Sequence, residues 1–474
     1  MNLKNKKMLW IVAIFIFAIG PAIGSYFAAP YYKLMTVGNA MNAMTLCSST
    51  FISGRNAADI LNQDLAPYKS FPMQATIDYN QNTVTSTFWG LATRKAIYRE
   101  GGGCTAILET TEEELRSQRI AQIEHLPANS SEVYWPTGDL NAFDLVPKGV
   151  NMVNLTKVVE RAFSEPDVEK PRWTRAIVVV YRGKIIAESY APDITKDTAH
   201  IGWSMSKSVT SALIGILIGQ DKLSLDKRAP IEEWSTAGDR RRRITLKNLL
   251  QMSSGLGFIG SSSASVNDTS KMLFDVKDAG RYATGISLAH EPGHWEYANG
   301  NTVILNEIIQ RTLGNEKNSV FPRKALFNKI GMRSAVINLD PSGAHIGSVF
   351  MYASARDWAR FGLLYLNDGV WEGERILPKD WVAFTLTPIS SFTKESGGYG
   401  AQFWTNKPYD EKNGKLKWPA VPIDAFYLGG HQGQYVVIIP SRQLIVVRLG
   451  MTHKELEAKW DMGEFMTDLL NAVE

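Results

Sequence analysis

Apolar residues form short, nearly continuous runs at the two ends of the C-terminal two-thirds of the chain. Residues 176–190 read AIVVVYRGKIIAESY, two apolar stretches around the turn residues Arg182 and Gly183. Residues 435–449 read YVVIIPSRQLIVVRL and have the same form. Two apolar stretches joined by a few turn residues are typical of a β-hairpin, so we expect a mainly antiparallel sheet.

Between these hairpins, apolar residues recur at helical spacing. The pattern predicts helices over 208–219, 245–252, 302–313 and 355–367, and a last amphipathic helix from about Lys454 to Val473. Strands at both ends of a segment, with helices between them, favour an α+β layered fold. We therefore expect one domain over residues 151–474, an antiparallel sheet flanked by helices.

An uncharged run of 22 residues, from Met8 to Ala29, follows three lysines near the N-terminus. A run of this length can cross a bilayer, and the lysines before it indicate that the N-terminus stays in the cytoplasm. We interpret residues 1–29 as a signal anchor in the inner membrane. The alternative is a signal peptide, interrupted at Gly20-Pro21 and cleaved near residues 22–24. Both interpretations place the bulk of the protein on the periplasmic or extracytoplasmic side of the cell envelope.

Residues 30–150 form a separate β-rich module in this interpretation. The stretch from Ala75 to Leu108 is rich in Thr, Val, Ile and aromatic residues, which predicts strands. The module holds both cysteines, Cys47 and Cys104. An exported location permits a disulfide between them, worth about 4 kcal/mol in the chain-entropy model. Two buried free thiols are the alternative.

Composition narrows the functional classes. The chain has 474 residues, 45% of them hydrophobic and 10% aromatic, which is enough for a sizeable core and argues against disorder. A formal net charge of +4 gives no indication of a nucleic-acid partner, and the sequence does not indicate an oligomeric state. Two cysteines are too few for a disulfide-rich scaffold.

Three short motifs match known patterns in the wrong context. GLGFIG at 255–260 follows a helical pattern, whereas a dinucleotide fingerprint follows a strand and opens a helix. HEPGH at 290–294 has the spacing of a zinc site, but Pro292-Gly293 predicts a turn where that site needs a helix. RRRR at 240–243 is typical of a solvated turn, with an anionic partner as the alternative. We predict no metal and no organic cofactor.

The pattern Ser-x-x-Lys occurs three times, and only Ser204–Lys207 opens a long apolar helix. Ser224–Lys227 lies in a polar segment and Ser391–Lys394 in a loop. A serine and a lysine three residues apart share a helix face. At the N-terminus of a buried helix, the helix dipole and burial both favour the neutral amine, which can act as a base. A lysine that extends from the helix end to solvent is the alternative.

Two later motifs add to this pair. Tyr297 and Asn299 lie in the turn-rich segment EPGHWEYANGN, where active-site groups are often found. His431-Gln432-Gly433 precedes a strand in LGGHQGQYVVII, and the glycine allows close backbone approach by a ligand.

These three motifs, in this order, resemble those of the penicillin-recognising serine hydrolases, which include class C β-lactamases, D,D-peptidases, esterases and D-aminopeptidases. The segments ITLKNLLQMSSGLG and ASARDWARFGLLYLNDGVWEGERILP also look like this family. The segment around Ser204 is similar to the 6-aminohexanoate-oligomer hydrolase branch. CSSTFISGR and GGGCTAIL look like segments of exported relatives of that branch. The resemblance covers about 170–450 well and 40–110 loosely, and it implies a β-lactamase/D,D-peptidase-like fold.

The resemblance also implies a role for each residue. Ser204 is the nucleophile that forms an acyl-enzyme, Lys207 is its base, and Tyr297 relays a proton to the leaving group, with its pKa lowered by the lysine ammonium. Asn299 holds Lys207 and the substrate amide. The backbone N–H groups of Ser204 and Gln434 form the oxyanion hole. His431 and Gly433 bind substrate.

One position departs from the family pattern. Penicillin-binding members usually have Lys-Thr-Gly at the third motif, where this chain has His-Gln-Gly. A histidine is mostly neutral at pH 7 and does not replace a permanent cation. We therefore expect an exported amidase or esterase acting on a small molecule, rather than a β-lactamase. A D,D-peptidase or D-aminopeptidase acting on cell-wall peptides is the alternative, and a non-catalytic envelope binding protein is another.

Overall fold

The computed structural model describes residues 20–69, 71–121, 132–141, 147–260, 266–389, 398–408 and 415–473. The signal anchor expected over residues 1–29 lies largely outside these ranges, which include its backbone only from Gly20. Among the described residues, no helix is both long enough and apolar enough to span a bilayer. The anchor stays a prediction.

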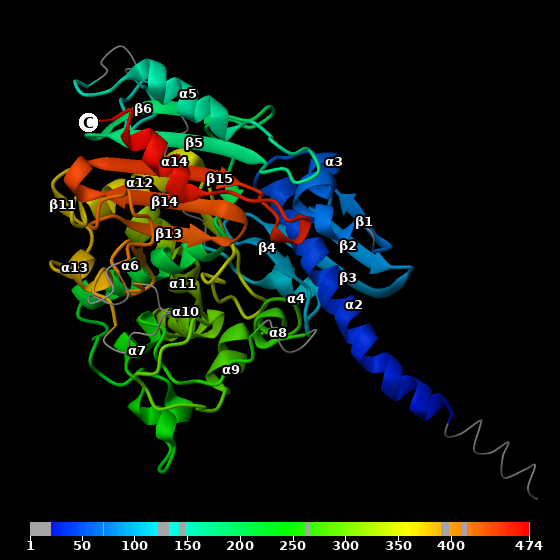
Figure 1. Cartoon of the computed structure of the whole chain (residues 1–474). Coiled ribbons are helices and arrows are strands. Elements are labelled where there is room, and N and C mark those ends of the chain that lie inside the picture. The colour runs from blue at the N-terminus through cyan, green and yellow to red at the C-terminus, as the bar shows by residue number, and fades with distance from the viewer. Residues whose placement is uncertain are drawn as a thin grey trace, which may run out of the picture.

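Six antiparallel strands form the central sheet of the C-terminal domain (Figure 1). Their order is β12 (Trp404–Thr405), β13 (Phe426–Gly430), β14 (Gln434–Ile439), β15 (Leu444–Gly450), β5 (Thr174–Tyr181) and β6 (Lys184–Tyr190). The predicted hairpins are β5–β6 and β14–β15. Because β15 pairs with β5, the end of the domain lies directly beside its beginning.

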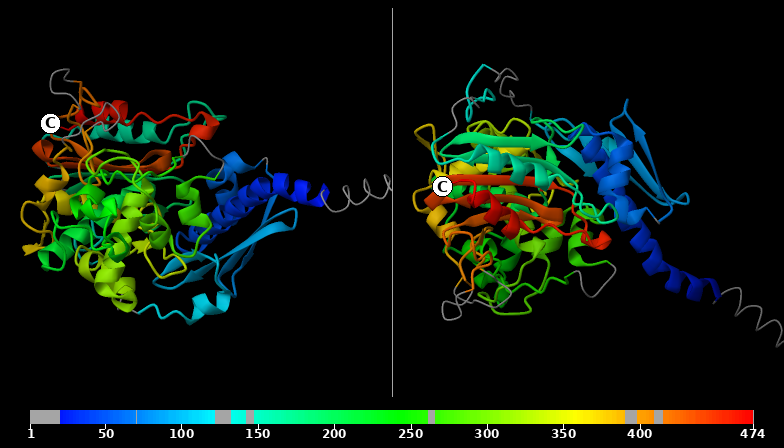
Figure 2. Two further views of the ribbon diagram at one scale, coloured as in Figure 1. Left: turned by 90° about the horizontal axis from the view of Figure 1, so that it is seen from below. Right: turned by 45° about the horizontal axis from the view of Figure 1, so that its top comes forward.

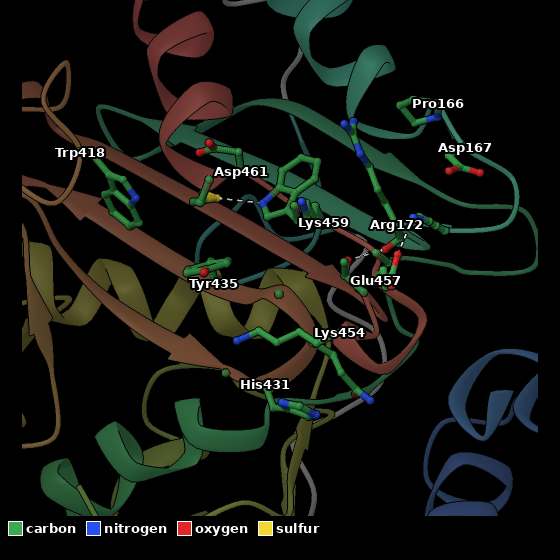
Figure 3. A pocket seen from close by; sticks show the side chains of 18 residues that line it. Pro166, Asp167, Arg172, Trp418, His431, Tyr435, Lys454, Glu457, Lys459 and Asp461 are labelled. Atoms are coloured by element: carbon green, nitrogen blue, oxygen red, sulfur yellow. Dashed lines mark hydrogen bonds and ion pairs between the residues drawn. The ribbon is translucent and has the colours of Figure 1, made fainter. Parts of the chain in front are cut away.

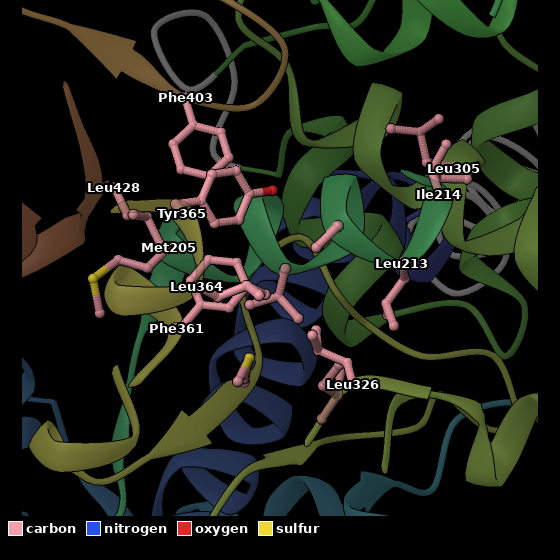
Figure 4. Packing of buried hydrophobic residues seen from close by; sticks show 14 of the residues in the cluster. Met205, Leu213, Ile214, Leu305, Leu326, Phe361, Leu364, Tyr365, Phe403 and Leu428 are labelled. Atoms are coloured by element: carbon pink, nitrogen blue, oxygen red, sulfur yellow. The ribbon is translucent and has the colours of Figure 1, made fainter. Parts of the chain in front are cut away.

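Both faces of this sheet are buried. Ile177 and Val179 of β5 belong to the cluster that contains α5 (Met152–Ala162) and α14 (Met462–Leu470). Val178 and Val180 point the other way. They belong to the larger cluster, which contains α6 (Ser206–Gly219), α10 (Asn299–Leu313) and α12 (Ala355–Leu366). Figure 2 shows helices on the two sides of the strands, and Figure 4 shows the packing around α6 and α12. The expected α+β fold is confirmed, and burial of both faces explains why the strands read as continuous apolar runs.

The N-terminal module combines one long helix with a small antiparallel sheet. Helix α2 (Gly20–Phe51) lies against β1 (Met73–Asp78), β2 (Thr83–Phe88), β3 (Leu91–Arg99) and β4 (Gly103–Ala106). A disulfide joins Cys47 of α2 to Cys104 of β4, with 6.2 Å between their Cα atoms. The N-terminal part of α2 extends away from the rest of the molecule (Figure 1).

The module packs directly on the C-terminal domain. One apolar cluster contains Cys47 and Cys104 together with residues of the C-terminal domain. Among these are Ile201, three residues before Ser204, and Phe350 and Tyr352 at β9. A buried ion pair adds to this contact: Asp64 lies 2.5 Å from Arg175 of β5 and 2.6 Å from Arg55.

Residues 132–141 pack with the C-terminal domain rather than with the module to which they were assigned. Trp135 belongs to the large core cluster. The Arg360 guanidinium of α12 donates hydrogen bonds to the carbonyls of Pro136 (2.9 Å) and Gly138 (2.7 Å), and to Asp139 (2.6 Å). By packing, the C-terminal domain therefore begins before residue 151.

The last helix is shorter than predicted. A turn of 3-10 helix, η10 (Lys454–Leu456), is followed by extended chain, and α14 starts only at Met462. The Asp461 carboxylate accepts a hydrogen bond from the Glu464 N–H and so caps the helix at that point. Glu457 has a left-handed backbone, which interrupts any helix through it.

The remaining elements are short and connect these layers. They are α3 (Ala57–Asp59), η2 (Ile60–Asp64), η3 (Ala66–Tyr68), α4 (Glu112–Ser117), β7 (His200–Ile201), η4 (Trp203–Met205), η5 (Glu232–Trp234), η6 (Arg240–Arg243), α7 (Leu246–Leu250), α8 (Asp268–Phe274), α9 (Ala279–Thr284), α11 (Asn315–Pro322), η7 (Arg323–Phe327), β8 (Val336–Ile337), β9 (Met351–Ala353), β10 (Val370–Trp371), β11 (Glu374–Arg375), α13 (Trp381–Thr385), η8 (His431–Gly433) and η9 (Pro440–Arg442).

Candidate active site

Ser204 lies on η4, immediately before the buried helix α6. The preceding residue, Trp203, has a left-handed backbone with φ of 48°, a conformation that is costly for a bulky residue and recurs at functional sites. Two hydrogen bonds fix this turn to β9: the Gly202 N–H donates to the Met351 carbonyl, and the Met351 N–H donates to the side-chain Oγ of Ser206. The turn therefore holds Ser204 at the junction between the sheet and the helices.

Lys207 is buried in the first turn of α6, with 1% of its surface exposed. Its Nζ lies 3.0 Å from Ser204 Oγ, 2.6 Å from Asn299 Oδ1 and 2.8 Å from the Ser348 carbonyl oxygen. Burial lowers the pKa of Lys207 to about 7. The alternative of a lysine that extends to solvent does not describe this side chain.

Asn299 is the first residue of α10 and orients Lys207. Its Oδ1 accepts a hydrogen bond from Lys207, and its Nδ2 donates to Thr269 Oγ1 of α8 at 3.2 Å. The amide is thus engaged at both ends by the protein. We expected Asn299 to hold the substrate amide as well, and the bond to Thr269 leaves less of its donor capacity for that contact.

Tyr297 lies beside the pair in an aromatic cluster. A hydrogen bond links its side chain to Ser204, and the Lys207 Nζ lies 5.2 Å from its ring centroid. The ring contacts Tyr399 and Trp404, each with centroids 5.6 Å away. Burial raises the pKa of Tyr297 to about 12 although the bond to Ser204 opposes this. The expectation of a lowered tyrosine pKa is therefore wrong, because desolvation outweighs any effect of the lysine.

The third motif forms η8, the turn between β13 and β14. His431 is exposed, and its ring meets the Trp203 ring edge to face with centroids 5.5 Å apart. Partial desolvation lowers the pKa of His431, with a further lowering from Lys454 and an opposing effect from Glu455. The Trp203 Nε1 donates to Gln432 Oε1 at 2.8 Å, so this motif also fixes the turn before Ser204.

Gly433 lies against Arg448 of β15. Its φ is 82°, and a Cβ at this position would lie 2.3 Å from Arg448 Nη1. The buried Arg448 guanidinium donates to the Gly433 carbonyl at 2.8 Å. The glycine thus permits close approach of an arginine, and it also lines the cavity beside the turn. Its role in substrate binding stays a prediction.

The register of β13 bears on the second oxyanion donor. The Asn406 N–H donates to the Ala425 carbonyl, so alternate residues, Ala425, Tyr427 and Gly429, direct their backbone polar groups towards the β12 edge. Gly430 and Gln434 then bond each other within the hairpin. This disfavours the predicted donor, the Gln434 N–H.

The end of β13 also lies very near the Ser204 turn. A Cβ on Gly430 would be 2.3 Å from the Gly202 carbonyl oxygen. Because β12 begins at Trp404, which pairs with Tyr427, the polar backbone groups of Gly429 face the edge beyond that strand. The Gly429 N–H is therefore better directed towards this region than that of Gln434.

A cavity of about 990 Å³ opens beside the β13–β14 turn (Figure 3). His431 lies at its edge, close to Lys454, and aromatic residues including Trp418, Tyr435 and Trp460 line its wall. The remaining wall carries both lysines and carboxylates. A group bound here would contact one side of His431.

The other short motifs take no part in this site. His290 and His294 stack on each other in a turn, with ring centroids 3.9 Å apart, and the described residues contain no group of three or more potential metal ligands. GLGFIG follows α7 rather than a strand. In the RRRR run, Arg241 pairs with Asp239, and Arg240 and Arg243 pair with Glu291. Ser391 and Lys394 lie outside the described residues.

Sequence reasoning missed three groups that position the pair. They are the strained Trp203, the side chain of Gln432 and the backbone carbonyl of Ser348. Trp203 adjoins Ser204 and Gln432 lies inside the third motif, so their positions were available signals. The Ser348 carbonyl has no signal in the sequence, because any residue carries one.

A sheet with helices on both faces, and a cluster of Ser204, Tyr297 and the buried Lys207 where they meet, define a β-lactamase-type serine hydrolase. The beta-lactamase family model matches residues 161–460, more than half of the chain. The chain belongs to the beta-lactamase family of serine hydrolases, as the sequence motifs implied.

The chain is similar to two named hydrolases and to a penicillin-binding protein homologue. The chain is 24% identical over 293 residues to the 6-aminohexanoate-dimer hydrolase of Paenarthrobacter ureafaciens, covering 57% of this chain and 74% of that protein. The fold is similar to that of EstCE1, a hydrolase with promiscuous acyltransferase activity (TM-score 0.53, 18% identity, 68% and 99% of the two chains). It is also similar to a penicillin-binding protein homologue from Caulobacter crescentus (TM-score 0.50, 14% identity, 69% and 99%).

Proposed function

We propose that this protein cleaves amide or ester bonds of a small molecule through an acyl-enzyme on Ser204. The observation that supports this most strongly is the set of contacts around Lys207. Two of its three partners, Asn299 Oδ1 and the Ser348 carbonyl, can only accept hydrogen bonds. A neutral amine has two N–H donors for these two acceptors, and its lone pair is then left for the Ser204 hydroxyl.

In acylation, the Ser204 hydroxyl transfers its proton to Lys207 as Oγ attacks the substrate carbonyl. The lysine is now an ammonium in a buried site, which favours rapid loss of that proton. Tyr297, bonded to Ser204 and neutral at physiological pH, donates its hydroxyl proton to the leaving amine or alkoxide and recovers one from Lys207. Water, deprotonated by the same groups, then releases the acid product from Ser204.

The tetrahedral intermediates need two donors for the oxyanion. We assign these roles to the backbone N–H groups of Ser204 and Gly429, with Gly429 in place of Gln434. The strand register and the approach of β13 to the Ser204 turn support this assignment. Such donors typically contribute a few kcal/mol of transition-state stabilisation.

The third motif favours an amidase or esterase over a β-lactamase. His431 has a lowered pKa and is neutral at pH 7, so it cannot provide a fixed cation at this position. The Paenarthrobacter relative is named as a 6-aminohexanoate-dimer hydrolase, which supports an amide substrate. EstCE1 is described as a hydrolase with promiscuous acyltransferase activity, which supports a hydrolase that accepts more than one kind of acyl group. Cleavage of cell-wall peptides is the second candidate, supported by the penicillin-binding homologue's fold.

We also propose that the catalytic domain works outside the inner membrane. The uncharged run from Met8 to Ala29 and the lysines before it support a signal anchor. The Cys47–Cys104 disulfide supports an oxidising compartment.

The test is turnover by the full-length protein in detergent micelles. Its substrates are a p-nitrophenyl ester, the linear 6-aminohexanoate dimer, a D-alanyl-D-alanine peptide and a chromogenic cephalosporin. Ser204→Ala should lower turnover by about 10³-fold or more with unchanged thermal unfolding. Ser224→Ala, in the second Ser-x-x-Lys motif, is the matched control and should keep full activity. Turnover retained by folded Ser204→Ala contradicts the proposal, and preference for the peptide selects the second candidate.

A further inference from the structure

Large apolar side chains are exposed at one end of the N-terminal module. We call these six residues the aromatic end: Tyr31 (71% exposed), Tyr32 (51%), Leu34 (41%), Phe71 (53%), Trp89 (71%) and Leu91 (57%). Exposure of a single such side chain is ordinary, but several at one place indicate a contact surface.

The strand register shows that these residues share one end. Phe71 precedes β1, and the β2–β3 turn, which pairs Phe88 with Leu91, carries Trp89 at its tip. Along α2, Asn39 donates to the Ala92 carbonyl, whereas Phe51 contacts Tyr79 and Tyr98 at the opposite end of the sheet. Helix α2 therefore runs along the sheet, with Asn39 near the aromatic end and Phe51 at the opposite end of the sheet.

The aromatic end lies level with the middle of helix α2 rather than with either of its ends. Trp89 is about three residues beyond Ala92 along the strand direction, or roughly 7–10 Å. At about 1.5 Å per helical residue, that distance corresponds to α2 near Leu34. Leu34 of the helix thus lies at about the height of Trp89, and Tyr31 and Tyr32 lie within one further helical turn towards the N-terminus.

The backbone at the tip of this hairpin is unusual for the residue that it carries. Trp89 and Gly90 both have positive φ, 49° and 77°, as in the two-residue turns that favour Asn, Asp or Gly. A tryptophan here is strained and largely exposed, with its ring edge to face against Phe88 at 5.1 Å between centroids, an arrangement that folding alone does not require.

The sheet strands at this end carry cations and no carboxylate. The sequence of β1 up to Ile77, and that of residues 83–98, contain no carboxylate, whereas Arg94 and nearby Lys69 are cationic. Two further cations have carboxylate partners from other segments: Lys95 pairs with Glu112, and Lys33 pairs with Asp275. Such a surface suits a layer of anionic headgroups, which attracts cations and repels carboxylates.

Helix α2 continues N-terminally past this same end. Helix α2 extends N-terminally beyond the module (Figure 1), and it continues the uncharged run that begins at Met8 and ends at Ala29. Twenty-two helical residues span about 33 Å, close to the hydrocarbon thickness of a bilayer. Residues just after Ala29 would then lie in the headgroup layer, where tyrosine and tryptophan are enriched.

We propose that the aromatic end is a membrane-contacting surface, which rests in the headgroup layer and holds the module upright on the bilayer. Its partner is a lipid surface that contains anionic headgroups. The proposal rests on the proposed signal anchor and adds to it a second contact, through Trp89, Leu91 and Phe71 of the sheet. It does not depend on the chemistry at Ser204.

The test is tryptophan fluorescence of the full-length protein in nanodiscs of phosphatidylethanolamine and phosphatidylglycerol. Lipids brominated near the headgroup quench nearby indoles. Trp10 and Trp89 are the two tryptophans that the proposal places at the bilayer, so Trp89→Phe should remove roughly half of the quenching. In that background, Leu91→Trp should restore it. Tyr79→Trp, an exposed aromatic at the opposite end of the same sheet, is the matched control and should not.

The outcomes separate the surface from the anchor and from the enzyme. Quenching that Trp10→Phe removes but Trp89→Phe leaves unchanged would keep the anchor and overturn the aromatic end as a membrane contact. Equal gains from Leu91→Trp and Tyr79→Trp would also overturn it, because the lipid would then reach both ends. Ester turnover should be the same in all of these variants, so a failure of the proposed chemistry would appear separately.

Discussion

At the scale of single residues, Lys207 is the group on which the chemistry depends. Its Nζ is surrounded by three uncharged oxygen atoms, and burial lowers its pKa. A base must be unprotonated to act, and the pKa of Lys207 is about 7. We therefore expect kcat/KM to rise about tenfold per pH unit below pH 7 and to level off above it.

Substitution of Lys207 tests this assignment. Lys207→Arg keeps a cation at the site that does not deprotonate, so we expect a loss of about 10²–10⁴-fold in kcat with no inflection near pH 7. The pH profile of kcat/KM between pH 5 and 9 is the measurement. An inflection near 7 that persists in folded Lys207→Arg would assign the titration to another group.

Tyr297 should behave differently, because its raised pKa keeps it neutral over the same range. Tyr297→Phe removes the donor for the leaving group and should lower kcat by about 10²-fold or more. The inflection near pH 7 should remain, since Lys207 is still present. Substrates whose leaving groups need no proton, such as a p-nitrophenyl ester, should lose less activity than amides. Equal losses for both substrate types would argue against the relay.

At the scale of elements, the approach of β13 to the Ser204 turn sets the width of the site. A Cβ on Gly430 would lie 2.3 Å from the Gly202 carbonyl, so Gly430→Ala must push the strand and the turn apart. We expect kcat to fall by at least about tenfold, because oxyanion donors act only at short distance. Gly260→Ala, where an added Cβ meets nothing within 4 Å, is the control and should be neutral. Steady-state kinetics of both variants measure the effect.

The sequence pattern predicted most elements and missed those that depend on local caps. The hairpins at 176–190 and 435–449 and the helix that follows Ser204 were predictable, because apolar runs and periodicity report burial directly. The expected helix from Lys454 failed because Asp461 caps a later start. The pairing of β15 with β5 brings together residues more than 260 positions apart, and periodicity contains no information about such partners.

The residues of the candidate site also divide into those that the sequence predicted and those that depend on the folded structure. Ser204, Lys207, Tyr297 and Asn299 were predictable because spacing and motif order identify them. The surroundings of Gly433 and Gln434 were not predictable, since they depend on Arg448 packing under the turn and on the register of β13. The raised pKa of Tyr297 follows from burial among aromatic rings that come from distant segments.

At the scale of the whole molecule, one buried cluster joins the module to the catalytic domain. Burial alone would raise the pKa of Asp64, but Arg175 and Arg55 outweigh it and lower that pKa below its usual range. Asp64→Asn leaves two buried guanidiniums without a counter-charge and should lower the free energy of unfolding by about 3–5 kcal/mol at pH 7.

The pH dependence of this contribution has a definite sign. A lowered carboxyl pKa stabilises the folded state above the usual pKa near 4, and that stabilisation is lost as the pH falls through the folded value. The difference between wild type and Asp64→Asn should therefore be constant from pH 5 to 8 and shrink in stronger acid. Denaturant unfolding at several pH values measures it. The exposed Asp193→Asn is the control and should change stability by less than about 0.5 kcal/mol.

The disulfide should stabilise the module by a comparable amount. It closes a loop between residues 57 positions apart, which the chain-entropy model values at about 4 kcal/mol. Replacing both cysteines by alanine should therefore lower the unfolding temperature of the module, measured by calorimetry. Because Cys47 and Cys104 share an apolar cluster with Ile201 and Phe350, we expect activity to fall with the unfolding of the module. Full activity after the module unfolds would show that the site is independent of it.

The central claim is that Lys207 activates Ser204 as a nucleophile. The measurement that tests it most directly is peptide mass spectrometry of the folded protein after treatment with a fluorophosphonate, repeated with a penicillin. The account predicts one fluorophosphonate adduct, on Ser204, formed faster above pH 7 and absent from Lys207→Arg, with little or no penicilloyl adduct. Absence of any adduct on Ser204 from either reagent would contradict the account. Rapid labelling of Ser204 by penicillin would support Ser204 as the nucleophile but would favour a cell-wall peptide as the substrate.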